Sequence, residues 1–420
     1  MTRHSGKQSM QRCLFPGFAL LAVLCVLAVR CGSSDDGGLQ WSGPRGWEEV
    51  VTDSMAGDDS GSTYYVDPGD TGSKTKDWNL PPKPLEVCLD YLDESSLAPA
   101  FSKECQSSAV CPCGGVDLGE VIAHAIEDAE VSVDLCVMQL QDFTISDALI
   151  AAQERDVAVR IIVDDGYATA DIEKAIEHLQ AAGVAILADS SSNKLMHSKF
   201  VVIDGATSLI SSGNFSTYDA SSNANNLLLF RSPALATGLL SRFDDMWTDK
   251  AFYNPADAGP FSTTVDGAKV HWYHGPDWAM IDALVSAIEG AEEAIHFSIF
   301  SFTLESVKEA LTDRCGEVEL LGLYDESQAN GDDSMAPAGW CPQADIRKAK
   351  IEGDFGFKKL HHKYLIVDPG VDGKGTVITG SANWSYSAAT KNAELMVQVR
   401  DGQVVQAFES EFQARFAHSL

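Results

Sequence analysis

The sequence predicts an α/β fold made of two copies of one unit. Short apolar strands alternate with amphipathic helical segments from about residue 120 onward, a pattern typical of a largely parallel or mixed sheet covered by helices on both faces. The segment AIEDAEVSVDLCVMQL at 125–140 recurs as AIEGAEEAIHFSIFSF at 287–302, and a polar motif that begins at His197 recurs at His361. The two offsets are 162 and 164 residues. Because two separate landmarks give nearly the same offset, we expect a duplicated unit with two α/β halves.

The length and the net charge of the chain limit the size of its core and the substrates it is suited to bind. The chain has 420 residues, 45% of them hydrophobic, which is enough for a large core. Its formal net charge is −31, from 61 acidic and 30 basic residues. Nonspecific binding of nucleic acid depends on Lys and Arg neutralising phosphates. The acidic balance therefore disfavours a nucleic-acid substrate without excluding it.

The first 31 residues have the pattern of an export signal. Three basic residues precede an apolar run at 14–29, and a polar segment follows. This pattern predicts a signal peptide or lipoprotein leader at 1–31, since the run is shorter than the roughly 20 apolar residues that span a bilayer comfortably. Cys31, followed by Gly-Ser-Ser-Asp-Asp, resembles the lipid-modified first residue of a bacterial lipoprotein, but Arg30 stands where a small residue is usual. We expect an exported protein, secreted, periplasmic or anchored as a lipoprotein; a retained anchor helix is the alternative.

The remaining chain divides into four segments. Residues 32–84 are rich in Gly, Ser, Asp and Pro and predict a disordered acidic linker. The first half is expected at 85–250, a second linker at 251–270, and the second half at 271–420. The elements expected in the first half are, in order, the strand VSVDLCVMQL, the helix ISDALIAAQERD, the strand VAVRIIVDD, the helix TADIEKAIEHLQAAG, the strands VAILAD, KFVVID and NNLLLF, and a helix at 233–250.

Seven cysteines lie beyond the predicted leader. Four of them cluster before the first repeat, two bracket a polar insertion, and one lies in an apolar strand: Cys88, Cys105, Cys111 and Cys113; Cys315 and Cys341; Cys136. In an exported protein this spacing predicts up to three disulfides and one free buried thiol. The pairing among the first four is left open. A zinc site in CQSSAVCPC is an alternative, although no histidine lies close by.

The repeated polar motif reads H-x-K, four residues, D, and then a Gly- and Ser-rich segment with an Asn. Its two copies supply His197, Lys199, Asp204 and Asn214, and His361, Lys363, Asp368 and Asn383. Side chains alternate between the faces of a strand, so His and Lys two residues apart project side by side. An imidazole beside a fixed cation is suited to gripping a phosphate.

These paired motifs resemble the HKD signatures of the phospholipase D superfamily, over roughly residues 120–420. The resemblance implies a duplicated phospholipase D-like fold, in which two α/β halves with mixed sheets are related by a pseudo-twofold axis. Both H-x-K pairs would then face one phosphate. The family's chemistry implies a phosphodiesterase that uses no metal and no cofactor.

The resemblance also implies a role for each residue of the motif. One histidine attacks phosphorus and forms a phosphohistidine, and the other protonates the leaving oxygen and then activates water. The side chains that would hold the non-bridging oxygens are Lys199, Lys363, Asn214 and Asn383. Asp204 and Asp368 are expected to organise the local backbone and the lysine rather than to transfer protons.

An acidic residue after the Asn of one half tends, in this family, to orient the histidine of the other half. Aligning NFSTYDASSNAN with NWSYSAATKNAE places Asn225 opposite Glu394. A carboxylate that accepts a hydrogen bond from imidazole fixes its tautomer and raises its basicity. We predict that Glu394 supports His197 as the nucleophile and that His361 is the general acid.

Several substrates fit such a site. Hydrolysis of phosphatidyl lipids at a membrane surface agrees best with export and with the acidic charge. A nuclease or nucleic-acid phosphodiesterase is the first alternative, and a cardiolipin-synthase-like transferase is the next. A phosphate-binding surface protein without turnover is the alternative from another class. Both halves lie in one chain, so a monomer suffices; the lipid headgroup and the choice between water and an alcohol acceptor stay open.

Overall fold

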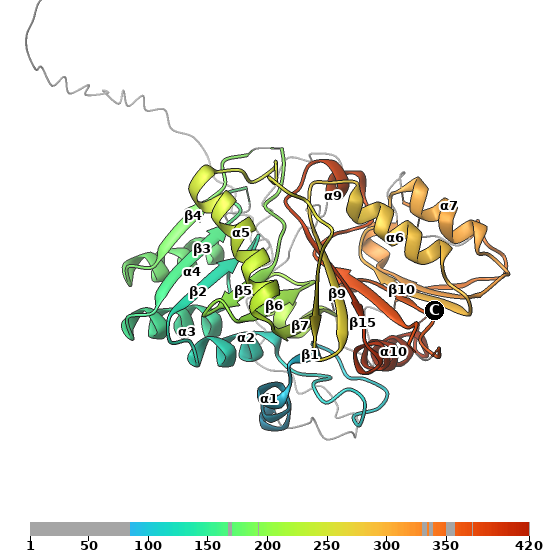
Figure 1. Cartoon of the computed structure of the whole chain (residues 1–420), viewed down its shortest axis with the longest axis horizontal. Helices are drawn as coiled ribbons and strands as arrows, with labels where there is room; N and C mark the ends of the chain where they lie inside the picture. Colours follow the sequence, from blue (N-terminus) through green and yellow to red (C-terminus); the bar gives the residue numbers. More distant parts are fainter. Residues whose placement is uncertain are drawn as a thin grey trace, which may run out of the picture. The chain divides into compact units, whose positions relative to one another are not determined.

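The computed structural model describes residues 85–166, 170–191, 193–329, 334–335, 339–349, 358–371 and 373–419. All of them belong to one compact unit (Figure 1). The predicted leader at 1–31 and the predicted linker at 32–84 lie outside the described residues. None of the helices within the described ranges combines the length and the apolar character needed to cross a bilayer.

A seven-stranded mixed sheet forms the first half (Figure 1). Its strands are β1 (Leu97–Phe101), β2 (Ser132–Cys136), β3 (Ala158–Val163), β4 (Ala185–Ala188), β5 (Phe200–Ile203), β6 (Thr207–Ser211) and β7 (Asn226–Arg231). They lie in the order β1-β7-β6-β5-β2-β3-β4. β2, β3 and β4 are parallel, and the other neighbours are antiparallel.

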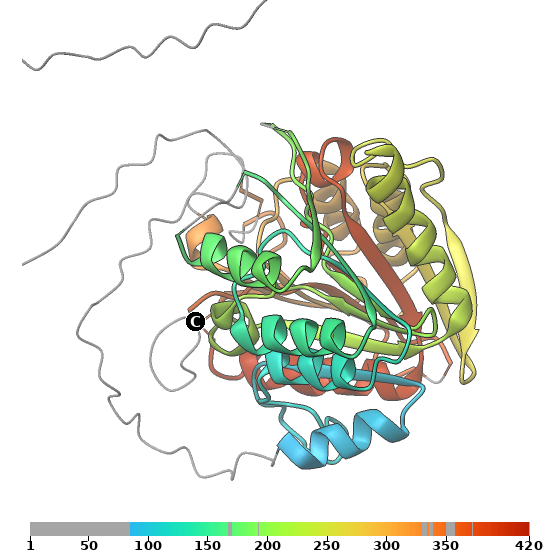
Figure 2. The same ribbon diagram turned by 90° about the vertical axis from the view of Figure 1, so that its left-hand side faces the viewer.

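Helices cover both faces of this sheet. They are α1 (Leu85–Glu94), α2 (Leu118–Glu127), α3 (Phe143–Glu154), α4 (Ala170–Ala181) and α5 (Pro233–Asp249), with one turn of π-helix, η1 (Tyr218–Ser222). Phe200 and Val202 of β5 pack in the same hydrophobic cluster as α5, and Val201 and Ile203 pack with α2 and α3. Figure 2 shows α2 and α3 (teal) and α5 (yellow-green) on opposite sides of the strands. Burial on both faces explains why KFVVID has no polar alternation.

The second half repeats this arrangement. Its strands are β8 (Phe261–Val265), β9 (Ala268–His274), β10 (Ala294–Ile299), β11 (Glu319–Tyr324), β12 (Asp345–Lys348), β13 (Lys363–Val367), β14 (Thr376–Gly380) and β15 (Leu395–Arg400); its helices are α6 (Ala279–Glu289), α7 (Glu305–Asp313), α8 (Glu326–Ala329), α9 (Tyr386–Thr390) and α10 (Gly402–Phe416). The order β9-β15-β14-β13-β10-β11-β12 matches that of the first sheet strand for strand, with β8 added beside β9. The predicted α/β fold with two mixed sheets in duplicated halves is confirmed.

The segment predicted as a linker at 251–270 contains part of the second sheet. β8 lies wholly inside it, and β9 begins at Ala268. Asp266 and Gly267 join the two strands and both have positive φ, 47° and 88°, as the first and second residues of a tight hairpin turn require. The connection between the halves is therefore shorter than predicted and ends before Phe261.

Three disulfides form among the described cysteines, as the sequence predicted. They are Cys88–Cys113, Cys105–Cys111 and Cys315–Cys341, and Cys136 is buried with a free thiol. The first two hold the chain between α1 and α2. With four sulfurs in disulfide bonds, that cluster offers no thiolate to a zinc ion.

The two halves share a hydrophobic cluster. It contains Phe200 and Leu228 of the first sheet together with Val397 and Phe408 of the second half. Phe101, at the end of β1, packs edge to face on Phe408 of α10, with ring centroids 4.9 Å apart. The halves thus meet across a packed interface, and the motif residues lie at that interface.

Candidate active site

The two H-x-K segments lead into equivalent central strands. His197 and Lys199 precede β5, and His361 precedes β13, which begins at Lys363. All four side chains are buried: the exposed fractions are 1% and 0% for the first pair, and 7% and 2% for the second. Burial of four ionisable side chains in one region is expensive unless they are paired, and each of them has partners.

Each H-x-K segment is hydrogen-bonded to the opposite half. The backbone N–H of His197 donates to the carbonyl of Ala393 at 2.9 Å, and that of His361 donates to the carbonyl of Ala224 at 3.0 Å. The residues before the two histidines form bridges with the same two segments. This exchange is reciprocal, as expected of halves related by a pseudo-twofold axis, and it brings the residue after Ala393 to His197 and the residue after Ala224 to His361.

Glu394 is the partner of His197. Its Oε2 lies 2.9 Å from Nδ1 of the imidazole, and it also accepts hydrogen bonds from Ser381 Oγ and Asn392 Nδ2. Burial alone would raise the pKa of Glu394, but the charge of His197, its hydrogen bond and the nearby Lys199 lower the pKa below its ordinary value. The ionised carboxylate therefore holds a proton on Nδ1 and leaves Nε2 of His197 for chemistry.

Asn225 is the partner of His361. Its Oδ1 lies 3.1 Å from Nδ1 of the imidazole and accepts a second hydrogen bond from Ser212 Oγ at 2.9 Å. Its Nδ2 donates to the backbone carbonyl and the carboxylate of Asp219, which fixes the orientation of the amide. Because an amide oxygen only accepts, Nδ1 of His361 is the donor, and Nε2 is again the nitrogen left for chemistry.

The two lysines are arranged alike. Nζ of Lys199 donates to the carbonyl of His197 at 2.7 Å, and Nζ of Lys363 donates to the carbonyl of His361 at 2.8 Å. Each ammonium is thus held beside the histidine of its own motif. Lys363 also reaches the carbonyl of Ser212 in the opposite half, at 3.4 Å. The predicted phosphate-binding residues Asn214 and Asn383 follow β6 and β14 and are buried.

Asp204 and Asp368 lie at the other end of their strands. Both have a left-handed backbone, with φ of 51°. Their carboxylates accept the backbone N–H groups of Glu130, Val131 and Ser132, and of Glu292, Glu293 and Ala294. They join the strand after the histidine to the start of β2 or β10, which is a structural position remote from the imidazoles. The cavity beside Asp204, of about 210 Å³, and the cavity beside Asp368, of about 290 Å³, are lined by none of the motif histidines or lysines.

Two further aspartates position the H-x-K segments, and the sequence analysis missed them. Asp164 follows β3 and accepts the N–H of Met196 at 2.7 Å. Asp325 follows β11 and accepts the N–H of Leu360, also at 2.7 Å. VAVRIIVDD and VELLGLYDE align at these positions, so the repeat contained the signal that would have found them.

Asp164 lowers the free energy of unfolding by an amount that depends on pH. Burial and the neighbouring Asp189 raise its pKa to about 6. Because the pKa of Asp164 is higher in the folded protein than in the unfolded chain, the protonated carboxyl group stabilises the fold at low pH. This stabilisation is lost as pH rises through about 6. We expect Asp164→Asn, which keeps an oxygen for Met196, to raise the free energy of unfolding relative to wild type by at most about 3 kcal/mol at pH 7.5 and by little at pH 4.5.

Urea unfolding of both proteins at the two pH values measures this difference. Asp165→Asn, at the exposed neighbouring position, is the control and is expected to show a much smaller change. An equal gain for Asp164→Asn at both pH values would contradict the assignment.

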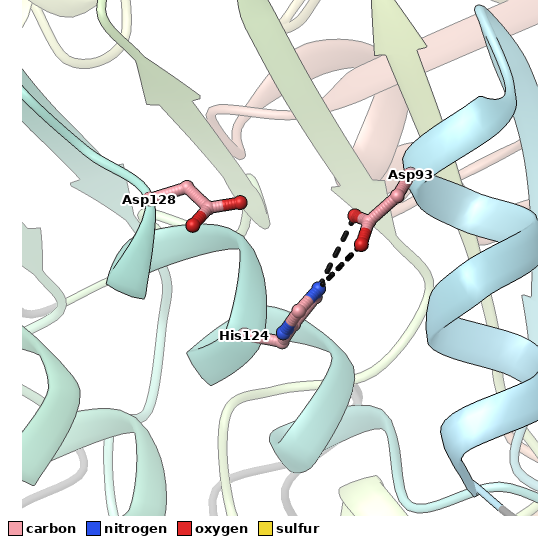
Figure 3. A group of neighbouring side chains, drawn as sticks. All are labelled: Asp93, His124 and Asp128. Carbon is pink, nitrogen blue, oxygen red and sulfur yellow. Dashed lines mark hydrogen bonds and ion pairs between the residues drawn. The ribbon is translucent and has the colours of Figure 1, made fainter.

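Two groups of side chains among the described residues gather enough carboxylate and imidazole atoms to be considered as metal ligands. They are Asp93, His124 and Asp128, and Asp164, Asp165 and Asp189. In Figure 3 the ring of His124 points from α2 toward Asp93 on α1, and its Nε2 lies 3.2 Å from both carboxylate oxygens. Arg231 lies 3.7 Å from the same carboxylate. Neither group includes a motif histidine or lysine.

The comparisons with known proteins agree with this geometry. The family model described as "Cardiolipin synthase, PLD-like domain" matches residues 122–247 and 284–416. These two matches fall on the two halves and together cover more than half of the chain.

Two relatives and one solved structure illustrate the likeness. The chain is 31% identical over 175 residues to the mitochondrial cardiolipin hydrolase of Xenopus laevis, which is 41% of this chain and 80% of that protein. It is 30% identical over 122 residues to the phospholipase D of Rickettsia conorii, 29% of this chain and 60% of that protein. The phosphatidylserine synthase of Haemophilus influenzae shares the fold, with a TM-score of 0.55 at 11% identity over 72% of this chain and 85% of that one.

Proposed function

This chain belongs to the phospholipase D-like family whose model it matches in both halves, and from that premise we propose that it is a metal-independent phosphodiesterase. The observation that carries the proposal is the pair of buried histidines, His197 and His361, each held through Nδ1 by a residue of the opposite half. We propose that both Nε2 atoms act on one phosphate, with Lys199 and Lys363 each held at the carbonyl of its own histidine.

The first chemical step forms a covalent intermediate. Nε2 of His197 attacks phosphorus, a P–N bond forms, and the bond from phosphorus to the leaving oxygen breaks. His361 gives its Nε2 proton to that oxygen, and an alcohol leaves. Lys199 and Lys363 stabilise the charge that builds on the non-bridging oxygens.

The second step regenerates the enzyme. Neutral His361 takes a proton from water, whose oxygen attacks phosphorus, and the P–N bond to His197 breaks. The product is a phosphomonoester, and the two histidines return to their starting protonation. One difficult displacement is thereby divided into two easier ones.

We propose phosphatidyl lipids, cardiolipin among them, as the substrates. The names of the relatives, cardiolipin hydrolase and phospholipase D, support this class. The net charge of −31 disfavours nucleic acid, because the long-range field of the protein repels a polyanion.

We also propose that the protein is exported and acts as a monomer at a membrane surface. The three disulfides support an oxidising compartment. A single chain supplies both histidines, so the site needs no second copy. The leader at 1–31 is the predicted export signal and is part of this proposal.

A substrate panel tests the proposed function. The purified chain is incubated with vesicles of phosphatidylcholine, phosphatidylglycerol or cardiolipin, and separately with single-stranded DNA, each with and without EDTA. We expect release of the alcohol from lipid, with phosphatidic acid as the product, at a rate that EDTA leaves unchanged. A strict metal requirement contradicts the mechanism. Cleavage of DNA alone replaces the lipase with the nuclease, and binding without turnover of either substrate replaces it with a phosphate-binding protein.

A further inference from the structure

The first half lacks a carboxylate at the position of Glu394 but has one elsewhere in the same site. Asn225 takes the place of Glu394, and Asp219 lies buried beside it. We propose that Asp219 is a positioning residue that supplies His361 with the carboxylate that Asn225 lacks. This inference rests on the proposed function and assigns how its general acid is held.

The contacts of Asp219 converge on His361. Its Oδ1 lies 3.5 Å from Nδ1 of the imidazole and 3.1 Å from Nδ2 of Asn225. The same oxygen accepts a hydrogen bond from Asn223 Nδ2 at 2.7 Å. Its Oδ2 accepts the backbone N–H of Asn214 at 3.0 Å. The carboxylate therefore holds both Asn225, which accepts from His361, and the backbone of the predicted phosphate-binding Asn214.

The rest of the site is the same in the two halves. Ser212 corresponds to Ser381, and their hydroxyls donate to Asn225 and Glu394 respectively. Asn223 corresponds to Asn392, and their amides donate to the carboxylates of Asp219 and Glu394 respectively. Asp219 lies five residues after Asn214, where the second half has Ala388 five residues after Asn383. The carboxylate of the first half thus lies six positions before Asn225, in the η1 turn, whose fold places it near the imidazole.

The two carboxylates act on their histidines to different degrees. Glu394 contacts His197 directly at 2.9 Å, whereas Oδ1 of Asp219 lies at 3.5 Å and is shared with two amide donors. A carboxylate near imidazole stabilises the protonated form. Because Asn225 holds Nδ1–H, the proton that His361 exchanges is on Nε2. The arrangement suits a residue that must begin the reaction protonated and end the first step neutral.

A change of leaving group separates this role from a purely structural one. An alkyl alcohol needs a proton to leave, but 4-nitrophenolate does not. We expect Asp219→Asn to lower kcat/KM, which reports the first step alone, by about 10- to 100-fold for phosphatidylcholine, part of the span of general acid catalysis, and by less than about threefold for bis(4-nitrophenyl) phosphate. KM is expected to stay within about twofold for both. Equal losses on the two substrates, or no loss on either, overturn the inference.

Placing the residues of the second half at the equivalent positions of the first half should restore the activity that is lost with Asp219. The double variant Asp219→Ala/Asn225→Glu reproduces Ala388 and Glu394 in the first half. Gly213 stands where the second half has Ala382, and the side chain of Asn225 fills the space that an alanine methyl would need there. We expect the double variant to recover most of the phosphatidylcholine activity that Asp219→Ala alone loses, and a double variant no better than the single one overturns the inference.

A matched control and a measurement without turnover complete the test. Asp142 is buried and accepts the backbone N–H of Thr144 at the start of α3, and Asp142→Asn is expected to leave the ratio of the two substrates unchanged. The ¹⁵N shifts of the imidazole report the protonation of His361 directly. The neighbouring Lys363 is held at the backbone carbonyl of His361. We expect its titration midpoint to move to lower pH in Asp219→Asn, and an unmoved midpoint overturns the inference. A wild-type chain inactive on both substrates refutes the proposed function, while the titration still decides the role of Asp219.

Discussion

His197→Ala is expected to abolish turnover and the covalent phosphoenzyme together. The proposed nucleophile is then missing. Loss of a nucleophile of this kind lowers kcat by at least about 10⁴-fold. Glu394 keeps Ser381 and Asn392 as hydrogen-bond donors in this variant, so the fold is expected to survive. Thermal unfolding of the variant checks that it does.

His361→Ala is expected to show the opposite pattern with an activated substrate. 4-Nitrophenolate leaves without a proton, so His197 still attacks bis(4-nitrophenyl) phosphate. The second step loses its general base, and the phosphohistidine accumulates. An alkaline quench followed by peptide mapping should place the phosphoryl group on His197, with a burst of 4-nitrophenolate of about one equivalent.

The histidine next to His361 provides the control for this pair of variants. His362 is buried and hydrogen-bonded to Asn226 and Glu411, on the other face of its strand. We expect His362→Ala to lower stability but to form the phosphoenzyme at the wild-type level per folded molecule. A phosphoryl group mapped to a peptide containing His361 in the wild-type chain would contradict the assignment of the nucleophile.

The repeat made much of this architecture predictable. Two landmarks with offsets of 162 and 164 residues indicated duplicated halves, and the structure has seven strands in the same order in each sheet. Period-2 spacing placed His197 beside Lys199 and His361 beside Lys363. Aligning the two segments that follow the Asn residues predicted Glu394 as the partner of His197, and the structure has a hydrogen bond between these two side chains.

Features that depend on three-dimensional convergence were harder to predict. The alignment compares equivalent positions, so it recorded Asn225 as a lost carboxylate and gave no reason to examine Asp219, which has an alanine as its counterpart. Strand β8 and the start of β9 fell within the predicted linker at 251–270, although Asp266 and Gly267 are a strong turn signal. Asp164 and Asp325 occupy equivalent places in the repeat and could have been found from it, but only the fold shows which backbone N–H each of them accepts.

Glu394→Gln is expected to lower kcat by between about 10²- and 10⁴-fold while leaving KM nearly unchanged. The substitution keeps the size of the side chain but removes its charge. An amide can present N–H to Nδ1 of His197, which favours the tautomer with its proton on Nε2 and so blocks the attacking nitrogen. The positive imidazole formed on attack also loses its counterion. Steady-state kinetics on phosphatidylcholine vesicles measures the loss.

Glu411→Gln is the matched control, because Glu411 is also fully buried and bonded to a histidine. It lies 3.2 Å from Nε2 of His362 and accepts from the hydroxyl of Tyr364 at 2.7 Å, and neighbouring charges hold its pKa below the ordinary value despite burial, as they do for Glu394. Both variants lose a buried carboxylate that is hydrogen-bonded to a histidine, so both are expected to lower the melting temperature. Only Glu394→Gln is expected to lower kcat per folded molecule, since His197 is the proposed nucleophile and His362 has no proposed part in the reaction. If the two variants lose activity in proportion to their loss of stability, then Glu394 stabilises the fold and does not set the state of the nucleophile.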